Sequence, residues 1–373
     1  MKRTRAVGVV VTVLAGGGLL AFGCVDPERS EPPQDLGEQS LAARNFCGNG
    51  HCDHGETCST CAQDCGSCGT GGAGTGGAGT GGAGTGGSGS GGAGGGAGVC
   101  GSTGAPPAHY DHVVIFSFEN RTWSNVGLGF SASTMPYLHS LAAQCSYFSD
   151  WTETNTSQDS LTQYIGETSG VNNPSTVNDC NPSPSCESTD NNIFRQVRQA
   201  SGTARNFVEG ATTGCSASGN AAKHIPDLYY FGTYTDGTGT HNDHDFCNTE
   251  VRPYSEFDVN NLPTYAFITP TLCNDGHDCG DATVDAWAST NIQRVLDSAA
   301  YKAGTVAVFV WYDEDHPTPN IQIAPTSHKG DITQTGVGTH AALLKTIEDL
   351  LGVPFMNQGQ LPGATDLRTI LGI

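Results

Sequence analysis

Three short groups of metal-type side chains each follow an apolar segment of the sequence. They are Glu119 with Asn120, the run from Asn274 to Asp278, and Asp313 with Glu314. Carboxylate and amide oxygens are the ligands that hard divalent cations prefer. Carboxylates that are brought close together repel one another unless a cation lies between them. If the fold gathers these groups, the sequence predicts a metal-dependent active site.

The apolar segments before these groups predict the strands that would position them. They span residues 113–118, 265–269 and 306–312, and they are short and rich in β-branched and aromatic residues. Nearly continuous apolar runs of this length are typical of strands buried on both faces of a parallel sheet. Ligand sites of such α/β sheets lie beyond the carboxyl ends of the strands. We therefore expect an α/β fold whose acidic groups meet at one edge of the sheet.

Ser160 is the candidate nucleophile. It begins a segment with helical character that Gly170 closes, and Asp159 before it suits a helix start. A hydroxyl at a helix N-terminus would lie beside free amides that can hold an oxyanion. No Gly-x-Ser-x-Gly motif is present, so a metal ion is the better activator of this weak nucleophile. A simple N-cap role for Ser160 is the alternative.

The first 24 residues predict export from a bacterial cell. Lys2, Arg3 and Arg5 precede a short apolar stretch that ends at Cys24, as in a signal peptide. The position of Cys24 is similar to a lipoprotein cleavage site, which would make it the lipidated first residue. We expect an outer-membrane or cell-surface lipoprotein, or alternatively a secreted protein with an ordinary cleaved signal.

Composition divides the rest of the chain into four segments. Residues 25–46 predict a polar tether, and residues 47–68 a Cys-rich module too small to bury a core. That module is either a disulfide-held knot or a calcium-binding loop. Residues 69–98 repeat Gly, Thr and Ala and predict a flexible linker. Residues 100–373 are then long enough for one catalytic domain.

Cysteine usage predicts an oxidising compartment. The chain has 15 cysteines, and 14 remain when Cys24 is set aside. Six lie within residues 47–68 and eight from Cys100 to Cys279. We expect three bridges in the small module and four in the large domain. The close pairs Cys180–Cys186 and Cys273–Cys279 are favoured.

The charge of the chain bears on its partners. From residue 100 onward there are 29 Asp and Glu against 11 Lys and Arg, a formal balance of −18. Such a surface repels nucleic acid and anionic membranes. We therefore expect no nucleic-acid partner, and a membrane contact only through the N-terminal lipid anchor. A site that handles phosphate would need metal ions to offset its acidity.

Several short segments share one pattern when they are taken together in chain order. They are residues 119–123, 135–141, 160–164, 168–170, 223–226, 274–278, 311–314 and 339–352. In this order they resemble the bacterial phosphoesterase family of the alkaline-phosphatase-like superfamily, which contains secreted acid phosphatases and phospholipases C, and the resemblance spans roughly residues 109–356. The resemblance implies a doubly wound, mostly parallel sheet sandwiched by helices.

The resemblance also implies roles for individual residues. A divalent metal would be bound by Glu119, Asn120, Ser160, Asp313 and Glu314. Three histidines would hydrogen-bond phosphoryl oxygens, serve a further metal or protonate the leaving group. They are His224, His277 and His340, and Asp275 would be their partner. Ser160 would attack in line and form a phosphoseryl intermediate. Oxygen ligands suit Ca, Mg or Mn, whereas the histidines leave Zn open.

The family pattern is not kept everywhere. Gln158 and Asp159 replace a His-Pro pair, Gln163 replaces an Asn, and Thr339 replaces an Asp. The expected function is an acid phosphatase acting on a small phosphate ester or a phospholipid. The alternatives are a phospholipase C-like phosphodiesterase, whose relatives generally carry extra domains after the catalytic one, and a degenerate surface binding protein. The polar run at 241–245 is expected to be a solvated turn.

Overall fold

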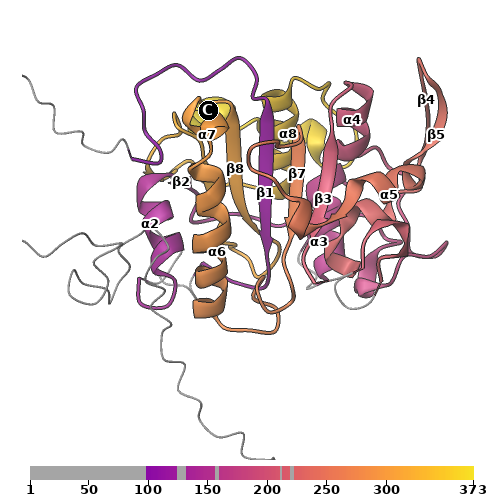
Figure 1. The fold of residues 1–373 in the computed structure, drawn as a ribbon, viewed down its shortest axis with the longest axis horizontal. Coiled ribbons are helices and arrows are strands. Elements are labelled where there is room, and N and C mark those ends of the chain that lie inside the picture. The colour runs from indigo at the N-terminus through magenta and orange to yellow at the C-terminus, as the bar shows by residue number, and fades with distance from the viewer. Residues whose placement is uncertain (1–97, 124–131, 156–158, 211, 219–221) are drawn as a thin grey trace, which may run out of the picture. The chain divides into compact units, whose positions relative to one another are not determined.

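The computed structural model describes residues 98–123, 132–155, 159–210, 212–218 and 222–373. Its centre is an eight-stranded sheet with the order β10-β2-β9-β8-β1-β7-β3-β6 (Figure 1). Among the described strands of this sheet, β9 alone runs antiparallel to its neighbours. The strands are β1 (His112–Phe118), β2 (Ser146–Tyr147), β3 (Ala204–Val208), β6 (Val251–Pro253), β7 (Tyr265–Thr269), β8 (Val306–Tyr312), β9 (Ile321–Ile323) and β10 (Gly330–Asp331), with a separate hairpin of β4 (Thr233–Asp236) and β5 (Gly239–Asn242). The predicted signal peptide, tether, Cys-rich module and linker lie outside the described residues.

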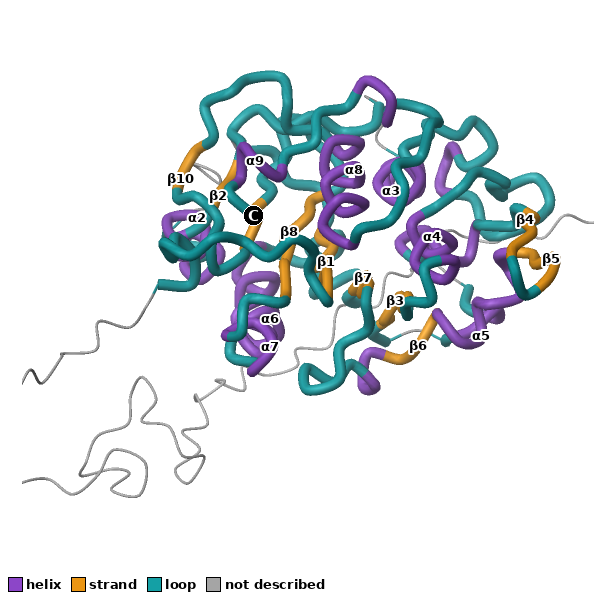
Figure 2. Tube along the Cα trace, turned by 90° about the horizontal axis from the view of Figure 1, so that it is seen from above, coloured by secondary structure: helices purple, strands orange, loops and turns teal. Residues whose placement is uncertain are grey.

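Helices cover both faces of the sheet (Figure 2). One face carries α3 (Ser160–Ser169), α4 (Ile193–Gln199) and α8 (His340–Leu351), and the other carries α2 (Pro136–Gln144) and α6 (Asp281–Leu296). The shorter helices are α5 (Cys247–Glu250), α7 (Ala299–Lys302) and α9 (Arg368–Leu371). This arrangement confirms the predicted α/β class with a mostly parallel sheet between layers of helices. Among the described helices, none has the length and apolarity needed to cross a membrane.

The central strands are buried because both of their faces pack against helices. In β1, Val113 and Ile115 belong to the core under α3 and α8, whereas Val114 and Phe116 belong to the core under α2 and α6. Alternate residues of a strand point to opposite faces, so a strand with two cores must be apolar throughout. The three predicted strands are confirmed as β1, β7 and β8.

Two helices end where glycine permits a left-handed backbone. Gly170 closes α3 with φ 72°, and Gly352 closes α8 with φ 66°. Glycine has no Cβ and therefore adopts this conformation without strain. The predicted helix after Ser160 and the predicted end at Gly170 are both confirmed.

Four disulfides join the eight cysteines of the described domain. The two favoured pairs, Cys180–Cys186 and Cys273–Cys279, are confirmed. The other two bridges are Cys100–Cys145 and Cys215–Cys247. Bridges of this number are typical of proteins that fold in an oxidising compartment.

The run at 241–245 is solvated only in part, since Asp245 is exposed whereas Asp243 is not the solvated residue that the sequence suggested. Asp243 is buried, and its carboxylate forms ion pairs with Arg195 and Arg198. Arg198 also pairs with the buried Glu250 at 2.5 Å. The prediction was wrong for Asp243 because the two arginines that neutralise it lie in α4, more than 40 residues earlier in the chain.

Candidate active site

The register of two neighbouring strands brings the first carboxylates together. Phe118 of β1 pairs with Tyr312 of β8, so Glu119 and Asp313 leave the sheet side by side. The amide of Glu119 also donates to the carbonyl of Asp275 at 2.9 Å, which ties in the segment after β7. The carboxyl ends of these strands lie along the lower edge of the sheet in Figure 1. The acidic groups therefore meet at one edge, as the strand pattern predicted.

Glu119, Asp313 and Glu314 form a buried carboxylate cluster. One oxygen of each lies within 4.8 Å of the other two. Asp313 Oδ2 and Glu314 Oε2 are buried and have no hydrogen-bond partner. An unpaired buried charge is costly. A hard divalent cation among these oxygens would satisfy them, so the residues fit the metal that the sequence implied.

Asn120 lies against the same cluster. Its backbone amide donates to Asp313 Oδ1 at 3.1 Å. Its side-chain amide faces Glu119 Oε2 and Glu314 Oε1, each at 3.0 Å. With Nδ2 turned toward them the amide donates to both carboxylates, and with Oδ1 turned toward them it would complete an all-oxygen ligand set. Its φ of 47° lies in the left-handed region, where asparagine is enriched among non-glycine residues.

Burial and crowding raise the pKa values of this cluster. Burial raises the pKa of Asp313 to about 7. Burial and the neighbouring Asp313 carboxylate raise the pKa of Glu314 to about 9. The pKa of Glu119 is also raised well above its ordinary value, first by burial and then by Asp313 and Asp275. A bound cation would oppose each of these shifts by stabilising the carboxylate form.

Ser160 lies at the start of α3 with its hydroxyl facing the carboxylates. Its Oγ donates to Glu119 Oε2 at 3.0 Å and lies 3.4 Å from Glu314 Oε1. The next two amides of the helix are not free. Leu161 N donates to Asp179 Oδ1 at 3.0 Å, and Thr162 N donates to the carbonyl of Asp159 at 3.1 Å. The oxyanion-holding role that we expected of these amides is therefore not available in this conformation.

His224 lies between two carboxylates of the site. Its Nε2 is 3.2 Å from Glu119 Oε1 and its Nδ1 is 3.2 Å from Asp275 Oδ2, although neither contact is aligned as a hydrogen bond. The ring stacks on Tyr164 and is fully buried. Burial lowers the pKa of His224 well below its ordinary value, which favours the neutral imidazole. Ligand atoms of Glu119, His224 and Asp275 lie within 4.8 Å of one another, so a second metal-type grouping shares Glu119.

His277 is the more exposed histidine of the site. Its Nδ1 contacts Asp278 Oδ1 at 2.7 Å, and its backbone amide donates to Asp275 Oδ1 at 2.8 Å. Its Nε2 lies 3.3 Å from Lys223 Nζ. The side chain of His277 is 30% exposed, whereas that of His224 is 0% exposed. The structure thus places His277 where solvent or a substrate group can reach it.

His340 is the first residue of α8, and both of its ring nitrogens have protein partners. Nε2 contacts the carbonyl of Asp313 at 2.6 Å. Nδ1 accepts from the indole of Trp151 at 2.9 Å and from that of Trp311 at 3.1 Å. Burial lowers the pKa of His340 to about 4, which favours the neutral ring. In this conformation the ring touches the backbone behind the carboxylates and leaves no nitrogen for phosphate or metal.

The described positions that depart from the family pattern have structural contacts. Gln163 accepts from Thr154 N at 2.9 Å and donates to the carbonyl of Asn155 at 3.0 Å. Thr339 is the N-cap of α8, since its side chain accepts from Ala342 N at 2.9 Å. Gln158 lies outside the described residues.

The structure adds contacts that sequence reasoning missed. Tyr164 donates to Glu119 Oε1 at 2.5 Å. Lys223 Nζ donates to Asp179 Oδ2 at 2.9 Å and lies 3.5 Å from Ser160 Oγ. Tyr164 and Lys223 both fall within segments that resembled the family, and this resemblance was the one sequence signal that could have identified them as site residues. Nothing in the sequence singled out Asp179.

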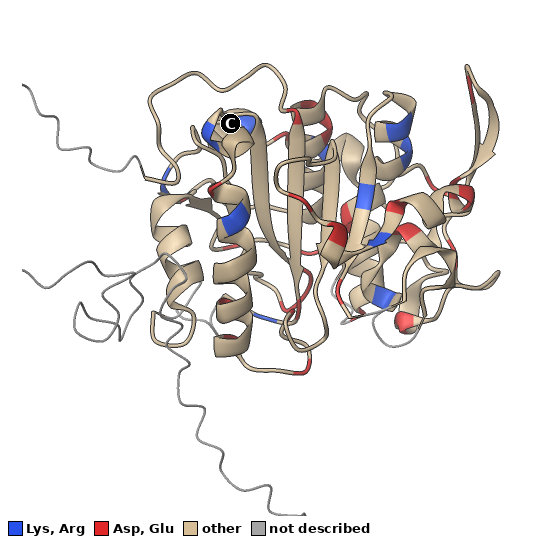
Figure 3. Cartoon of the chain, in the orientation of Figure 1, with Lys and Arg blue, Asp and Glu red and all other residues tan. Residues whose placement is uncertain are grey.

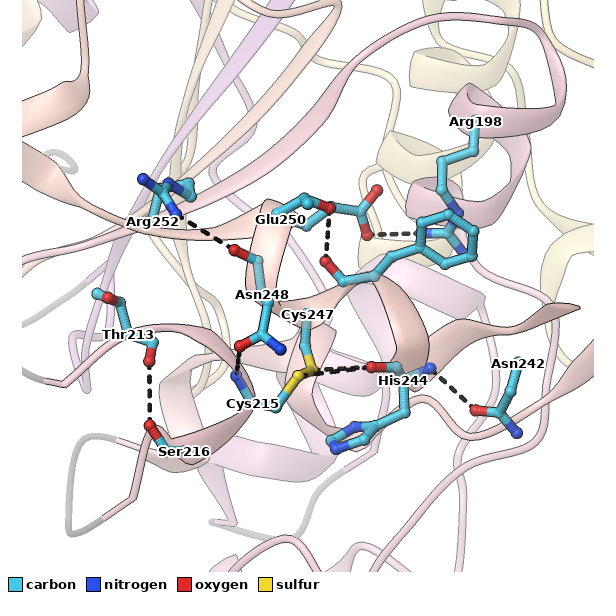
Figure 4. The surroundings of a disulfide bond; sticks show 12 residues. Arg198, Thr213, Cys215, Ser216, Asn242, His244, Cys247, Asn248, Glu250 and Arg252 are labelled. Carbon is cyan, nitrogen blue, oxygen red and sulfur yellow. Dashed lines mark hydrogen bonds and ion pairs between the residues drawn. A yellow bond between two sulfur atoms is a disulfide. The ribbon is translucent and has the colours of Figure 1, made fainter.

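Another metal-type grouping lies away from this edge. Cys215, His244 and Cys247 come within 4.8 Å of one another (Figure 4). The two cysteines form a disulfide and therefore offer no thiolate. The grouping is a covalent crosslink between α5 and a segment 32 residues earlier in the chain, and it is not a candidate metal centre.

Comparison with known proteins identifies a family whose match covers the region of the candidate site. The sequence profile of the phosphoesterase family matches residues 119–344, a range that contains every candidate site residue from Glu119 to His340. The phosphatidylinositol-3-phosphatase of Mycobacterium tuberculosis is 28% identical over 259 residues, which cover 66% of this chain and 78% of that protein.

Solved structures with a similar arrangement were also found. A protein of the alkaline phosphatase superfamily from Vibrio parahaemolyticus has a TM-score of 0.46 at 13% identity and covers 70% of both chains. A lipoteichoic acid synthase from Listeria monocytogenes has a TM-score of 0.41 at 13% identity and covers 70% of this chain and 76% of that one.

Proposed function

The chain belongs to the phosphoesterase family and is a hydrolase of phosphoric ester bonds, and we propose that it is a metal-dependent phosphomonoesterase. In this proposal Ser160 is the nucleophile. The single observation that carries it is the position of Ser160 Oγ, which lies 3.0 Å from Glu119 and 3.4 Å from Glu314 within one buried cluster. A serine used only as a helix cap has no need of these carboxylates, because capping requires only contacts to backbone amides.

The proposed metal site is made of Glu119, Asn120, Ser160, Asp313 and Glu314. Support comes from the unpartnered oxygens of Asp313 and Glu314 and from the all-oxygen set that Asn120 can complete. A divalent cation bound there would lower the pKa of the serine hydroxyl and offset charge that develops on phosphorus. These hard oxygen donors favour Ca, Mg or Mn, while His224 beside Glu119 keeps Zn among the candidates.

The proposed reaction has two displacements. Ser160 Oγ bonds to phosphorus as the ester P–O bond breaks, and its proton has two carboxylate acceptors within reach, Glu119 Oε2 and Glu314 Oε1. The alcohol leaves with a proton, which we assign to His277 because that ring is the exposed one. In the second displacement the oxygen of water bonds to phosphorus, and one water proton passes to His277. The P–Oγ bond breaks, Oγ regains the proton that the carboxylate took, and inorganic phosphate is released.

In this scheme His224 and His340 do not protonate the leaving group. The fully buried His224 would orient Glu119 and Asp275 or take part in a metal site with them. His340 would act as a positioning residue, because it holds the backbone of Asp313 and has no free ring nitrogen. The Asp275 carboxylate accepts a hydrogen bond from the backbone amide of His277 and so fixes the segment that carries this histidine.

The substrate class we propose is the phosphate monoester. The M. tuberculosis relative is named for removing the 3-phosphate of phosphatidylinositol, which is a monoester. A phosphoinositide headgroup is therefore a candidate substrate beside small phosphate esters. From residue 100 onward, Asp and Glu (red in Figure 3) outnumber Lys and Arg (blue) by 29 to 11, and a net negative charge disfavours close approach to an anionic bilayer. A soluble headgroup analogue should then be hydrolysed more readily than the same phosphate in an anionic vesicle.

We propose that the protein acts outside the cytoplasm. The four disulfides of the catalytic domain support this location. Membrane attachment through a lipid on Cys24 is part of the proposal. Fractionation of cells that express the wild type or Cys24→Ala tests it, since loss of the lipid should release the protein from the membrane fraction.

The proposed function is tested with two chromogenic esters. The purified full-length protein is assayed on p-nitrophenyl phosphate and on bis-p-nitrophenyl phosphate, with and without chelator, beside Ser160→Ala. Chelator-sensitive release from the monoester that is lost in the variant supports the proposal. Hydrolysis mainly of the diester would replace it with a phosphodiesterase of the phospholipase C type. No hydrolysis of either ester by folded, metal-loaded protein would favour the binding-protein alternative.

A further inference from the structure

One lysine approaches the candidate nucleophile in a site that is rich in carboxylates. Lys223 Nζ lies 3.5 Å from Ser160 Oγ, 2.9 Å from Asp179 Oδ2 and 3.3 Å from His277 Nε2. The Lys223 side chain is 15% exposed. We propose that Lys223 binds the phosphoryl group during transfer to Ser160 and that its ammonium selects dianionic phosphate monoesters over monoanionic diesters. This inference rests on the proposed function.

The three contacts of Lys223 match the three N–H donors of an ammonium group. One donor is held by the Asp179 carboxylate, which keeps the amine beside Ser160. A second faces His277 Nε2, which accepts it once that nitrogen has given its proton to the leaving group. The third contact, to Ser160 Oγ, is the longest of the three and therefore the weakest. When phosphorus bonds to Ser160 Oγ, the terminal phosphoryl oxygens lie two bonds from that atom, on the far side of phosphorus. The donor that faces Ser160 can then turn to a phosphoryl oxygen without breaking the other two contacts.

Asp179 fixes the ammonium relative to the nucleophile. Its Oδ2 accepts from Lys223, and its Oδ1 accepts from the amide of Leu161, the residue that follows Ser160. One carboxylate therefore joins the amine to the first turn of α3. The backbone of Asp179 has φ 49°, in the left-handed region that aspartate adopts more readily than most non-glycine residues. The next residue, Cys180, is anchored by the disulfide to Cys186, which holds this segment in place.

The charge of the ester determines how strongly its binding depends on Lys223. A monoester carries two negative charges above its second pKa, whereas a diester carries one. The carboxylates of Glu119 and Glu314 lie within 3.4 Å of Ser160 Oγ, and they repel each phosphate charge that a bound metal does not offset. The attraction of the ammonium grows with the charge of the ligand. Removing it should therefore weaken the binding of a monoester more than that of a diester.

The test compares Lys223→Met, which removes the charge and keeps the length, with wild type, Lys223→Arg and the control Lys302→Met. Lys302 lies in α7, where its amine contacts the carbonyl of Asp297. We expect Lys223→Met to lower kcat/KM for p-nitrophenyl phosphate by about 10²–10³-fold, the usual effect of losing one donor to transition-state charge. The loss on bis-p-nitrophenyl phosphate should be smaller, with partial recovery of monoester hydrolysis in Lys223→Arg.

A second measurement does not depend on turnover. Isothermal titration of the metal-loaded protein with inorganic phosphate should give a Kd that rises at least about tenfold in Lys223→Met, since the variant loses a hydrogen bond from a charged donor. Lys302→Met should match wild type in both measurements. The inference on Lys223 would be overturned by equal losses on the two esters or by an unchanged phosphate Kd. The proposed function would still hold in that case, provided that the wild type hydrolysed the monoester. If wild type hydrolysed neither ester, the phosphate titration alone would decide on Lys223.

Discussion

The hydroxyl of Tyr164 donates a 2.5 Å hydrogen bond to Glu119 Oε1, one helical turn after the serine that contacts Glu119 Oε2. Helix α3 therefore engages both oxygens of the same carboxylate. Groups that hydrogen-bond a metal ligand fix its orientation and tune its affinity for the metal. The proposed nucleophile and the proposed metal ligand thus contact one helix, so a substitution in that helix should change the affinity for the metal.

The Tyr164→Phe variant tests this connection. Removing the hydroxyl frees Glu119 Oε1, and we expect metal affinity to fall by about 10–100-fold, as is typical when an outer partner of a metal ligand is lost. Titration with the activating metal gives the Kd. Tyr230→Phe is the matched control, because its hydroxyl contacts Thr168 of the same helix at 2.7 Å. Equal metal affinities for wild type and Tyr164→Phe would show that this contact does not orient Glu119.

The Asp313→Asn variant tests the carboxylate cluster as a metal site. A ligand that binds only the native state at a hundredfold excess over its Kd stabilises that state by about 2.7 kcal/mol. We therefore expect metal to raise the Tm of wild type and to have little effect on Asp313→Asn, which should also lose activity. Asp331→Asn is the control, since Asp331 contacts Ser149 in an exposed position. The same metal-dependent rise of Tm in Asp313→Asn would exclude this cluster as the site.

The His340→Gln variant separates a positioning role from proton transfer. His340 contacts the carbonyl of Asp313 and two indoles, so its loss should displace a carboxylate and lower kcat by roughly 10–100-fold. The pH–rate profile should keep both of its limbs. His277→Gln, in contrast, should lose the limb that reports the general acid. If the pH–rate profile of His340→Gln lacked one limb, His340 would be the general acid, as the family resemblance allowed.

Glu348 of α8 should make stability depend on pH. Its Oε1 accepts from Gln196 Nε2 and from Met356 N, both at 2.8 Å, and burial raises its pKa to about 7. Because the folded pKa lies above the unfolded one, its contribution is complete below about pH 4.5 and is lost as the pH rises through 7. Each tenfold difference between the acid dissociation constants of the folded and unfolded states is equivalent to at most about 1.4 kcal/mol of stability.

The measurement is the urea midpoint at pH 5 and at pH 8 for wild type and Glu348→Gln. The glutamine stays neutral, so its midpoint should fall less between the two pH values. Glu256→Gln serves as control, since Glu256 forms an exposed pair with Arg252. Parallel pH dependence in wild type and Glu348→Gln would mean that Glu348 does not titrate as we describe.

The sequence predicted the parts of the site that depend on local pattern. The apolar run before Glu119 and the run before Asp313 identified adjacent parallel strands, and their register brings the two carboxylates together. The helix start at Ser160 was likewise visible, because Gly170 ends the segment. In each case the signal lies within about ten residues of the side chain concerned.

Contacts between distant segments were not predictable in this way. Asp179 reaches Lys223 across 44 residues, and no residue type or spacing marks that pair. His340 shows a different limit, because the resemblance gave its residue type but not its neighbours. Trp151 and Trp311 occupy its Nδ1, and this became visible only when the strands and helices were assembled.

The proposed metal ligands directly follow β1 and β8, apart from Ser160 at the start of α3, whereas Lys223, Asp179 and His277 come from connecting segments. This division separates the part of the proposed site that strand pairing holds from the part that the connections hold. Strand pairing fixes the spacing of the carboxylates, so drift in the connections leaves them in place. Descendants of such a chain could acquire a new ester preference by exchanging one connection, without rebuilding the centre that cleaves the bond.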